Sequence, residues 1–362
     1  MKDSSNFYQV IGLMSGTSLD GLDMAYVQFE IKEGQWHFEL GPSQSIDYSE
    51  EWRFRLKHSV DLSGLALSLL DREYGRWLGH QTRQFIESND LRINFIASHG
   101  HTVFHQIDKK FTLQIGHGQE LATVSGQRVI CDFRTKDVVL GGQGAPLVPI
   151  GDELLFGEYD YCLNLGGISN VSFRHEGKRK AYDIGLVNML LNYLTNQIGK
   201  AYDKGGELAA TGTLNQTLFD ELNALPYYQE PFPKSTGYEW FLEQVVPIVD
   251  RHSGLPMEDR LCTGVHHITY QIAEAVKSHS VQSGERLWAT GGGAKNDFLV
   301  GALRDYLGSQ VEVITPDESL IEFKEAIVFA LMGVLRERGE ANCLCSVTGA
   351  SSDNSGGVVY FP

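Results

Sequence analysis

Two segments of the chain follow one plan, in which a short apolar strand, a turn rich in glycine and a second apolar strand succeed one another. The first segment spans 8–29 and the second spans 161–173. Apolar runs that end at such turns are typical of β-hairpins. Because the plan occurs twice, we expect an α/β protein whose two lobes arose by duplication and whose glycine turns meet at one cleft.

The length of the chain leads to the same expectation. One hydrophobic core seldom organises as many as 362 residues, and such chains usually divide into two domains. A passage rich in glycine and proline at 141–149 is typical of a hinge or of a crossing between lobes. We predict an N-terminal lobe over 1–131, a C-terminal lobe over 132–343, and a C-terminal segment, 344–362, that returns to the N-terminal lobe.

The charge of the chain excludes some partners. Lys and Arg number 30 and Asp and Glu number 46, which gives a formal net charge of −16. Such a charge repels polyanions, so we expect neither nucleic acid nor an anionic membrane as a partner. The sequence shows no secretory h-region and no run of about 18 apolar residues that could span a bilayer. With five sparse cysteines, these features predict a cytoplasmic protein with free thiols.

The turn of the first hairpin offers groups that suit a phosphate. It matches neither a Walker loop nor a dinucleotide fingerprint, because both lead from glycines into a helix. It does carry unobstructed backbone N–H groups, the hydroxyls of Thr17 and Ser18, and the carboxylates of Asp20 and Asp23. Amides can bind phosphate oxygens while hard carboxylate oxygens bind Mg²⁺. The alternative is a plain β-turn with no ligand.

A third glycine cluster, at 289–296, follows a short apolar run and precedes a helix predicted over 297–307. Glycines there would let a flat adenine ring lie against the backbone. Each glycine turn taken alone is equally well explained as a structural turn. The occurrence of all three in this order is more specific, and it favours a nucleotide site.

Two polar segments, 97–105 and 131–137, each follow a short strand-like run. Residues at the carboxyl ends of strands in α/β sheets point into the ligand crevice, so both segments are candidates to hold a polar molecule rich in hydroxyls. Arg134 is the notable cation among them. It could instead be an ion-pair partner of Asp132 or Asp137.

Two carboxylates are candidates for the chemical step. Asp183 ends a short β-like run just before a helix predicted from Val187, where it could act as a general base or merely cap the helix. Glu325 lies in an apolar helical segment. It could reach the cleft from the first turn of that helix, or complement the helix dipole.

The ten residues from Met14 to Asp23, Met-Ser-Gly-Thr-Ser-Leu-Asp-Gly-Leu-Asp, resemble the signature of the anhydro-N-acetylmuramic acid kinases. Further segments resemble that family in the same order along the chain: 98–100, 112–116, 132–134, 141–149, 164–170, 233–237, 291–296 and 346–350. The resemblance covers essentially the whole chain, and several of the segments are too long for chance agreement.

The resemblance implies a two-lobed actin-like fold with an active-site cleft between the lobes, and the use of ATP and Mg²⁺. It also implies conversion of 1,6-anhydro-N-acetylmuramic acid to N-acetylmuramic acid 6-phosphate in the recycling of cell-wall peptidoglycan. In the family's mechanism an aspartate that corresponds to Asp183 takes a proton from the water that attacks the anomeric carbon. The released O6 then attacks the γ-phosphate, and Glu325 assists at the sugar and water end.

The resemblance also assigns residues to the ligands. It places the nucleotide at Gly16, Thr17, Ser18, Leu19, Asp20, Gly21, Leu22, Asp23, Gly166, Gly167, Asn170, Gly291, Gly292, Gly293 and Asn296. It places the amino sugar at His99, Gly100, Thr102 and Arg134. A guanidinium is a natural partner for the lactyl carboxylate of that sugar. Asp20 and Asp23 are the candidate ligands of Mg²⁺, and whether the protein is a homodimer stays open.

The chain departs from the family pattern beside Asp183. Where the family usually reads Asp-Thr-Gly-Pro-Gly-Asn, this chain has Ile184, Leu186 and Val187 at the second, fourth and fifth positions. His101 replaces a usual glutamine and introduces a titratable group.

Three alternative functions therefore stay open. The chain could be a nucleotide-gated sugar-binding protein that has lost turnover, or a kinase of a related sugar. A zinc hydrolase is the third, because the spacing of His99, His101 and His105 partly matches histidine clusters that bind zinc. It is disfavoured, since Val103 stands where such sites place an aspartate.

Overall fold

The computed structural model describes residues 6–16, 19–279 and 282–362. Its contacts divide the chain into two compact units, which are Met1–Leu155 with Phe323–Pro362, and Phe156–Glu322. Each unit is built around a β-sheet of its own with its own hydrophobic core.

The boundaries between the units lie after residues 155 and 322, whereas the sequence predicted them after residues 131 and 343. The difference arises because α5 (Pro149–Leu154) and most of α12 (Glu318–Arg338) pack together in the first unit. Asp152 and Lys324 form an ion pair of 2.9 Å between these helices, and both side chains are buried. This contact joins positions far apart in the sequence, so local patterns do not reveal it.

The sheet of the first unit begins with the predicted hairpin. Its strands, in spatial order, are β3 (Gln35–Asp47), β2 (Gly21–Lys32), β1 (Phe7–Met14), β4 (Phe95–Ser98), β7 (Val129–Cys131) and β13 (Val358–Tyr360). β1, β2 and β3 are antiparallel neighbours, whereas β4 runs parallel to β1 and β7 runs parallel to β4. The C-terminal strand β13 pairs antiparallel with β7, so the end of the chain belongs to this sheet.

The sheet of the second unit repeats this order. Its strands are β10 (Lys178–Leu186), β9 (Ile168–His175), β8 (Tyr161–Leu165), β11 (Glu285–Thr290) and β12 (Val311–Ile314). β8, β9 and β10 are antiparallel neighbours, and β11 and β12 continue the sheet in parallel. Counted from the first strand of each unit, the order is 3-2-1-4-5 in both, as expected for lobes that arose by duplication.

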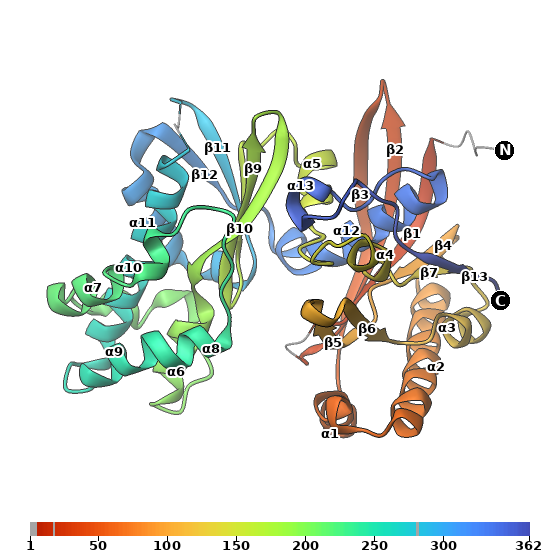
Figure 1. Cartoon of the computed structure of the whole chain (residues 1–362), viewed down its shortest axis with the longest axis horizontal. Helices are drawn as coiled ribbons and strands as arrows, with labels where there is room; N and C mark the ends of the chain where they lie inside the picture. Colours follow the sequence, from red (N-terminus) through yellow and green to blue (C-terminus); the bar gives the residue numbers. More distant parts are fainter. Residues whose placement is uncertain (1–5, 17–18, 280–281) are drawn as a thin grey trace. The chain divides into compact units, whose positions relative to one another are not determined.

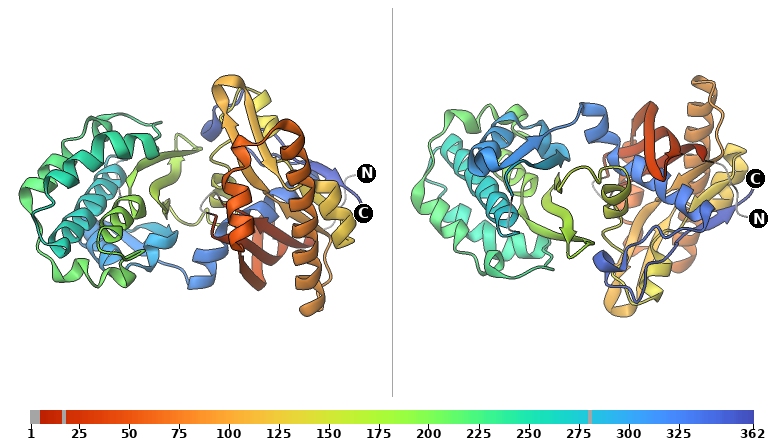
Figure 2. Two further views of the ribbon diagram at one scale, coloured as in Figure 1. Left: turned by 90° about the horizontal axis from the view of Figure 1, so that it is seen from below. Right: turned by 90° about the horizontal axis from the view of Figure 1, so that it is seen from above.

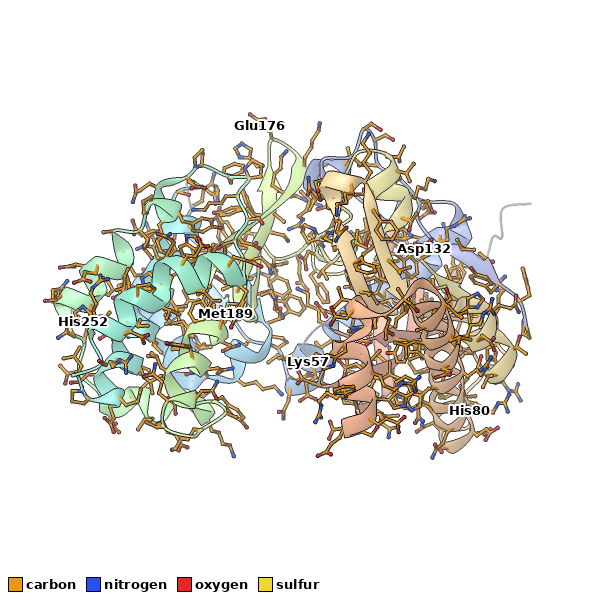
Figure 3. The ribbon with its side chains drawn as sticks, turned by 60° about the horizontal axis from the view of Figure 1, so that its bottom comes forward. Lys57, His80, Asp132, Glu176, Met189 and His252 are labelled. Carbon is orange, nitrogen blue, oxygen red and sulfur yellow. The ribbon has the colours of Figure 1, made fainter. Side chains whose placement is uncertain are left out.

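The second and third strands of each unit are joined by the same kind of turn. Glu33-Gly34 connects β2 to β3, and Glu176-Gly177 connects β9 to β10 (Figure 3). All four residues have positive φ angles, between 50° and 80°. Two-residue turns with φ above zero match the right-handed twist of an antiparallel hairpin.

The helices of the first unit are α1 (Glu50–Lys57), α2 (Gly64–Ser88), α3 (Gly118–Ser125), α4 (Thr135–Val139), α5, α13 (Cys345–Thr348) and α12 from Phe323 onward. α2 and α3 lie side by side (Figures 1 and 2).

α12 is buried on all sides from Ala326 to Leu335, which is typical of a helix in the centre of a domain. It packs so closely on β1 that a Cβ atom at Gly12 would overlap the carbonyl of Ala326. A separate hairpin joins β5 (His101–Gln106) to β6 (Phe111–Ile115).

The helices of the second unit are α6 (Asn188–Asn196), α7 (Gln216–Asn223), α8 (Tyr238–Trp240), α9 (Val246–Arg251), α10 (Met257–Lys277) and α11 (Asp297–Leu307). The predicted helix over 297–307 is therefore confirmed. α10 and α11 lie next to each other and contact β10 and β12 respectively (Figure 1). Met189 of α6, labelled in Figure 3, packs against the core of this unit. Among the described residues, no helix is long and apolar enough to cross a membrane.

Candidate active site

The first glycine turn lies between β1 and β2, as predicted. Thr17 and Ser18 lie outside the described residues. The side chain of Leu22 is fully buried in the core of the first unit, so only its backbone could face a ligand. Asp20 is exposed, and the carboxylate of Asp23 accepts a hydrogen bond of 2.5 Å from the hydroxyl of Ser45.

The segments that follow β4 and β7 in the first sheet bring His99 and Arg134 together. His99 follows β4 and Arg134 follows β7, and these strands are parallel neighbours whose carboxyl ends meet at one edge. The Nε and Nη2 atoms of Arg134 donate to Nε2 of His99 at 3.0 and 2.8 Å, and Nη1 donates to the carbonyl of Gly144 at 2.6 Å. Burial and the nearby guanidinium lower the pKa of His99 to about 3. The imidazole is therefore neutral, with Nδ1–H directed at the carbonyl of Gly100 at 2.8 Å.

Arg134 makes no ion pair with Asp132 or Asp137 among the described residues, so that alternative is wrong. The carboxylate of Asp137 instead accepts hydrogen bonds from the backbone of Gly144, from Thr348 and from Asn354, at 2.8, 2.8 and 2.9 Å. Asp137 thus fixes the backbone of Gly144, whose carbonyl holds Arg134. No local sequence pattern reveals this support, because Asp137 and Asn354 are 217 positions apart.

Glu325 lies well inside α12, which begins at Glu318. Neither a first-turn position nor a helix-dipole role fits this location, and both predictions are wrong. The Glu325 side chain is exposed, yet desolvation by the surrounding protein is the main influence on it and raises its pKa. Arg134 and Lys324 act in the opposite direction, so the carboxylate of Glu325 and the guanidinium of Arg134 belong to one electrostatic cluster.

The other two predicted sugar residues, Gly100 and Thr102, lie at the start of the hairpin formed by β5 and β6. Gly100 contributes to a pocket of about 180 Å³ whose walls include His99, Gln114 and Asp132. Thr102 of β5 accepts a hydrogen bond of 3.3 Å from Nε2 of Gln114. The segment 112–116, to which the sequence assigns no role, thus lies beside the predicted sugar residues Gly100 and Thr102.

The histidines of this region are not arranged as a metal site. Among the residues that the structure describes, no group of three or more His, Cys, Asp or Glu side chains is placed to hold a metal ion. His99 already accepts hydrogen bonds from Arg134. Burial lowers the pKa of His101 to about 4, so the substitution for glutamine adds no charge near neutral pH.

Asp183 lies within β10 and does not cap a helix, because α6 begins at Asn188 with Val187 before it. The capping alternative is therefore wrong. The backbone N–H of Thr236 donates to Oδ2 of Asp183 at 3.2 Å. The hydroxyl of Tyr227 donates to the carbonyl of Asp183 at 2.6 Å. Burial raises the pKa of this carboxyl, and the Thr236 amide lowers it in part.

The departures from the family pattern beside Asp183 lie in the core. Ile184, Leu186 and Val187 are at most 2% exposed and belong to the hydrophobic cluster of the second unit. Ile184 is the extra residue of a β-bulge between Asp183 and Gly185. Because Ile184 is buried in this core, the family's polar residue at that position has been replaced by one that packs.

The second glycine turn is shorter than predicted. It consists of Gly166 and Gly167, whereas Asn170 lies in β9 and pairs with Asp183 of β10. The placement of Asn170 in the turn is therefore wrong. The carbonyls of both glycines accept hydrogen bonds from the backbone N–H groups of Val187, just before α6, and of the first two residues of α6, at 2.9 to 3.1 Å, so the turn is fixed to the start of that helix.

The third glycine cluster lines a large pocket in the second unit. Gly291 has φ +82°, and a Cβ atom at Gly291 or Gly293 would meet the backbone or side chain of Leu165. The side chain of Asn296 caps α11 by accepting a hydrogen bond of 2.9 Å from Leu299. The pocket measures about 800 Å³, and its walls include Asn188, Asn192, Tyr202, Asp203, Lys204, Gly292, Lys295, Asn296 and Glu318. Gly292 and Asn296 are the predicted nucleotide residues that line it.

Two units that repeat one strand order, each with a glycine turn after its first strand, define an actin-like protein of the ATPase and sugar kinase class. The model of the anhydro-N-acetylmuramic acid kinase family matches residues 8–362. The chain belongs to that family.

Individual relatives agree with the family match. An anhydro-N-acetylmuramic acid kinase of Gloeobacter violaceus is 35% identical over 94% of this chain and 95% of its own length. One of Pasteurella multocida is 34% identical over 99% of this chain and 98% of its own length.

Among solved structures, the activator of the 2-hydroxyisocaproyl-CoA dehydratase from Clostridium difficile is similar with a TM-score of 0.43 and 12% identity, over 91% of this chain and 96% of that chain.

Proposed function

We propose that the protein is a kinase that uses ATP and water to convert 1,6-anhydro-N-acetylmuramic acid to N-acetylmuramic acid 6-phosphate. The observation that carries the proposal is the setting of Asp183, a partly buried residue whose carboxyl has a raised pKa; Oδ2 of that carboxyl accepts a hydrogen bond from the Thr236 amide, and Tyr227 bonds to the backbone carbonyl. A general base whose pKa lies nearer to neutrality transfers protons more effectively. Membership of the kinase family supports the assignment of the substrate.

The reaction balances as two bond exchanges. Asp183 takes a proton from water, the water oxygen bonds to the anomeric carbon C1, and the bond from C1 to O6 breaks. O6 then bonds to the γ-phosphorus of ATP while the bond from that phosphorus to the ADP oxygen breaks. The sugar gains one water and one phosphoryl group, and the proton on Asp183 returns to solvent.

Residues of the first unit bind the sugar in this proposal. Arg134 holds the lactyl carboxylate, since a guanidinium can bind a carboxylate through two parallel hydrogen bonds. His99 and Gly144 fix its orientation before the sugar arrives. Thr102 and Gly100 complete the sugar contacts, and Glu325 acts on the sugar and water from the same electrostatic cluster.

Residues of the second unit bind the nucleoside part of ATP. The pocket of about 800 Å³ is large enough for a nucleoside, and its Gly292 lets a flat ring approach the backbone. The phosphates bind the glycine turns at Gly16 and Gly166. Asp20 and Asp23 supply the type of oxygen that Mg²⁺ prefers, so the donor set fits this ion. Bound Mg²⁺ would offset negative charge on the phosphate oxygens.

The cytoplasm, where ATP is plentiful, is the place we propose for this activity, as a step in the recycling of peptidoglycan. The purified protein should consume ATP in the presence of Mg²⁺ only when 1,6-anhydro-N-acetylmuramic acid is added. Mass spectrometry should show a product heavier than the sugar by one phosphoryl group and one water. A product that gains only the phosphoryl group would indicate an ordinary sugar kinase, and binding of both ligands without ADP would indicate a sugar-binding protein.

A further inference from the structure

One buried hydroxyl beside the proposed base has no hydrogen-bond partner within the part of the chain that the structure describes. The side-chain oxygen of Thr236 is shielded from solvent and makes no hydrogen bond to any described residue. The same residue donates its backbone N–H to Oδ2 of Asp183 at 3.2 Å. Thr236 belongs to the segment 233–237, one of those that resemble the family, and the proposed function gives this segment no role.

An unsatisfied hydroxyl needs an explanation, because leaving a buried polar group without a hydrogen bond costs about 1 to 3 kcal/mol. Buried polar groups that have no protein partner usually bind an ordered water. The hydroxyl and the amide that contacts Asp183 belong to one residue, so one water is a candidate partner of both the hydroxyl and the carboxylate.

The segment that carries Thr236 is fixed against β10 by further contacts. The backbone N–H of Asp183 donates to the carbonyl of Lys234 at 3.1 Å. The ammonium of Lys234 donates to the carbonyl of Tyr227 at 2.9 Å and lies 4.5 Å from the centre of the Tyr227 ring. Tyr227 in turn donates to the carbonyl of Asp183. These contacts form a closed ring, so the backbone segment that carries Thr236 is held in place relative to the base.

We propose that the hydroxyl of Thr236 and the carboxylate of Asp183 together bind the water that attacks the anomeric carbon. The water donates one hydrogen to Asp183 and the other to Oγ1 of Thr236, which leaves a lone pair of its oxygen free to attack. Proton transfer then goes to Asp183 alone, and Thr236 keeps its own proton. This inference rests on the proposed function and adds a second residue that contacts the reacting water.

The test compares three variants of the full-length protein. Thr236→Val removes the hydroxyl but keeps the shape of the side chain and the backbone N–H, and it should lower kcat by about 100-fold while the KM of the sugar stays near the wild-type value. Thr236→Ser, which restores a hydroxyl, should recover most of the loss. Ser235→Ala removes a neighbouring exposed hydroxyl and is the matched control, with kcat unchanged.

A second readout does not depend on turnover. A crystal structure of the wild-type protein without sugar should contain an ordered water within hydrogen-bond distance of both Thr236 and Asp183, and the Thr236→Val structure should lack it. Absence of that water from the wild type overturns the inference. So does a Thr236→Val variant that keeps full activity, or a loss of activity that Thr236→Ser does not restore. If the wild type shows no turnover that depends on the sugar, the proposed function fails whether or not the water is present, whereas an active wild type without the water overturns the inference alone.

Discussion

The Nε2 atom of His99 accepts hydrogen bonds from both the Nε and the Nη2 atoms of Arg134, at 3.0 and 2.8 Å. An imidazole can accept in this way only through an unprotonated nitrogen, and its other nitrogen is directed at the carbonyl of Gly100. His99 therefore acts as a support for Arg134, and its side chain is already engaged before a sugar binds.

Removing this support should weaken sugar binding. In His99→Ala the guanidinium keeps only its bond to Gly144, so we expect the KM of the sugar to rise by about tenfold or more, since hydrogen bonds to charged groups contribute about 1.5 to 3 kcal/mol. His99→Gln retains an acceptor and should recover part of the loss. The KM of ATP serves as the internal control. Equal sugar KM values in all three proteins would contradict the supporting role.

The proposed base gives a second prediction. Asp183→Asn should fold normally, because the amide keeps the size of the side chain and an oxygen that can accept from Thr236. It should lower kcat by about 100-fold to 10,000-fold, the usual contribution of a general base. Steady-state kinetics with a thermal unfolding curve checks both parts, and near-normal turnover would remove Asp183 from this role.

The pH dependence of the reaction should reflect the raised pKa of Asp183. The carboxyl must be ionised to accept a proton, so kcat/KM should rise with pH through a pKa above the ordinary aspartate value of 3.8. The pH–rate profile of the wild type measures this limb. If the rising part of the profile has an apparent pKa at or below 3.8, burial does not set the protonation of the base.

Acid should destabilise the protein through its buried histidines. His267, which bonds to Tyr228 and Asn223, has its pKa lowered by burial from 6.5 to about 3. Below pH 6.5 the unfolded chain binds a proton at this site that the folded protein does not, so stability is lost as the pH falls from 6.5 towards 3. Replacing His267 by Asn should reduce the loss of unfolding free energy between pH 7 and pH 5 by about 2 kcal/mol. Urea unfolding at both pH values tests this, and an unchanged loss would contradict it.

The residue after Asp183 should matter for stability and little for turnover. Ile184→Thr restores the usual family residue but places a hydroxyl in the core, where Ile184 is 2% exposed. We expect a loss of about 1 to 3 kcal/mol of unfolding free energy, with kcat close to that of the wild type. A large fall in kcat at intact stability would show that position 184 contributes to the chemistry.

Filling the large pocket of the second unit should act on the nucleotide. A Cβ at Gly292 would meet only the side chain of Asn188, at 3.5 Å, so Gly292→Leu should fold while its side chain occupies the pocket. The KM of ATP should rise by about tenfold or more, a loss of about 1.4 kcal/mol or more of binding free energy. Gly301→Leu, on the neighbouring α11 with open space around its Cβ position, is the matched control. Equal KM values for ATP would place the nucleoside elsewhere.

Short-range patterns were enough to predict the hairpins and α11. Alternating apolar residues and glycine turns act over a few residues, and they located β1 with β2 and β8 with β9. The same patterns placed the ends of the strands less accurately. Asn170 and Asp183 both lie inside strands, because the pairing of β9 with β10 extends the sheet beyond the apolar run. In the sequence, the apolar residues 184, 186 and 187 are departures from the family pattern after Asp183. Their place in the hydrophobic core of the second unit explains why they are apolar.

The sequence by itself determined the class of the protein, since the repeated hairpin, the glycine clusters and the order of the quoted segments are properties of the chain. Tertiary structure alone decided which side chains act together. Arg134 and His99 are 35 positions apart, and Asp183 and Thr236 are 53 apart. A contact of that kind depends on how strands and helices pack, and the residues between its partners carry no local signal of it.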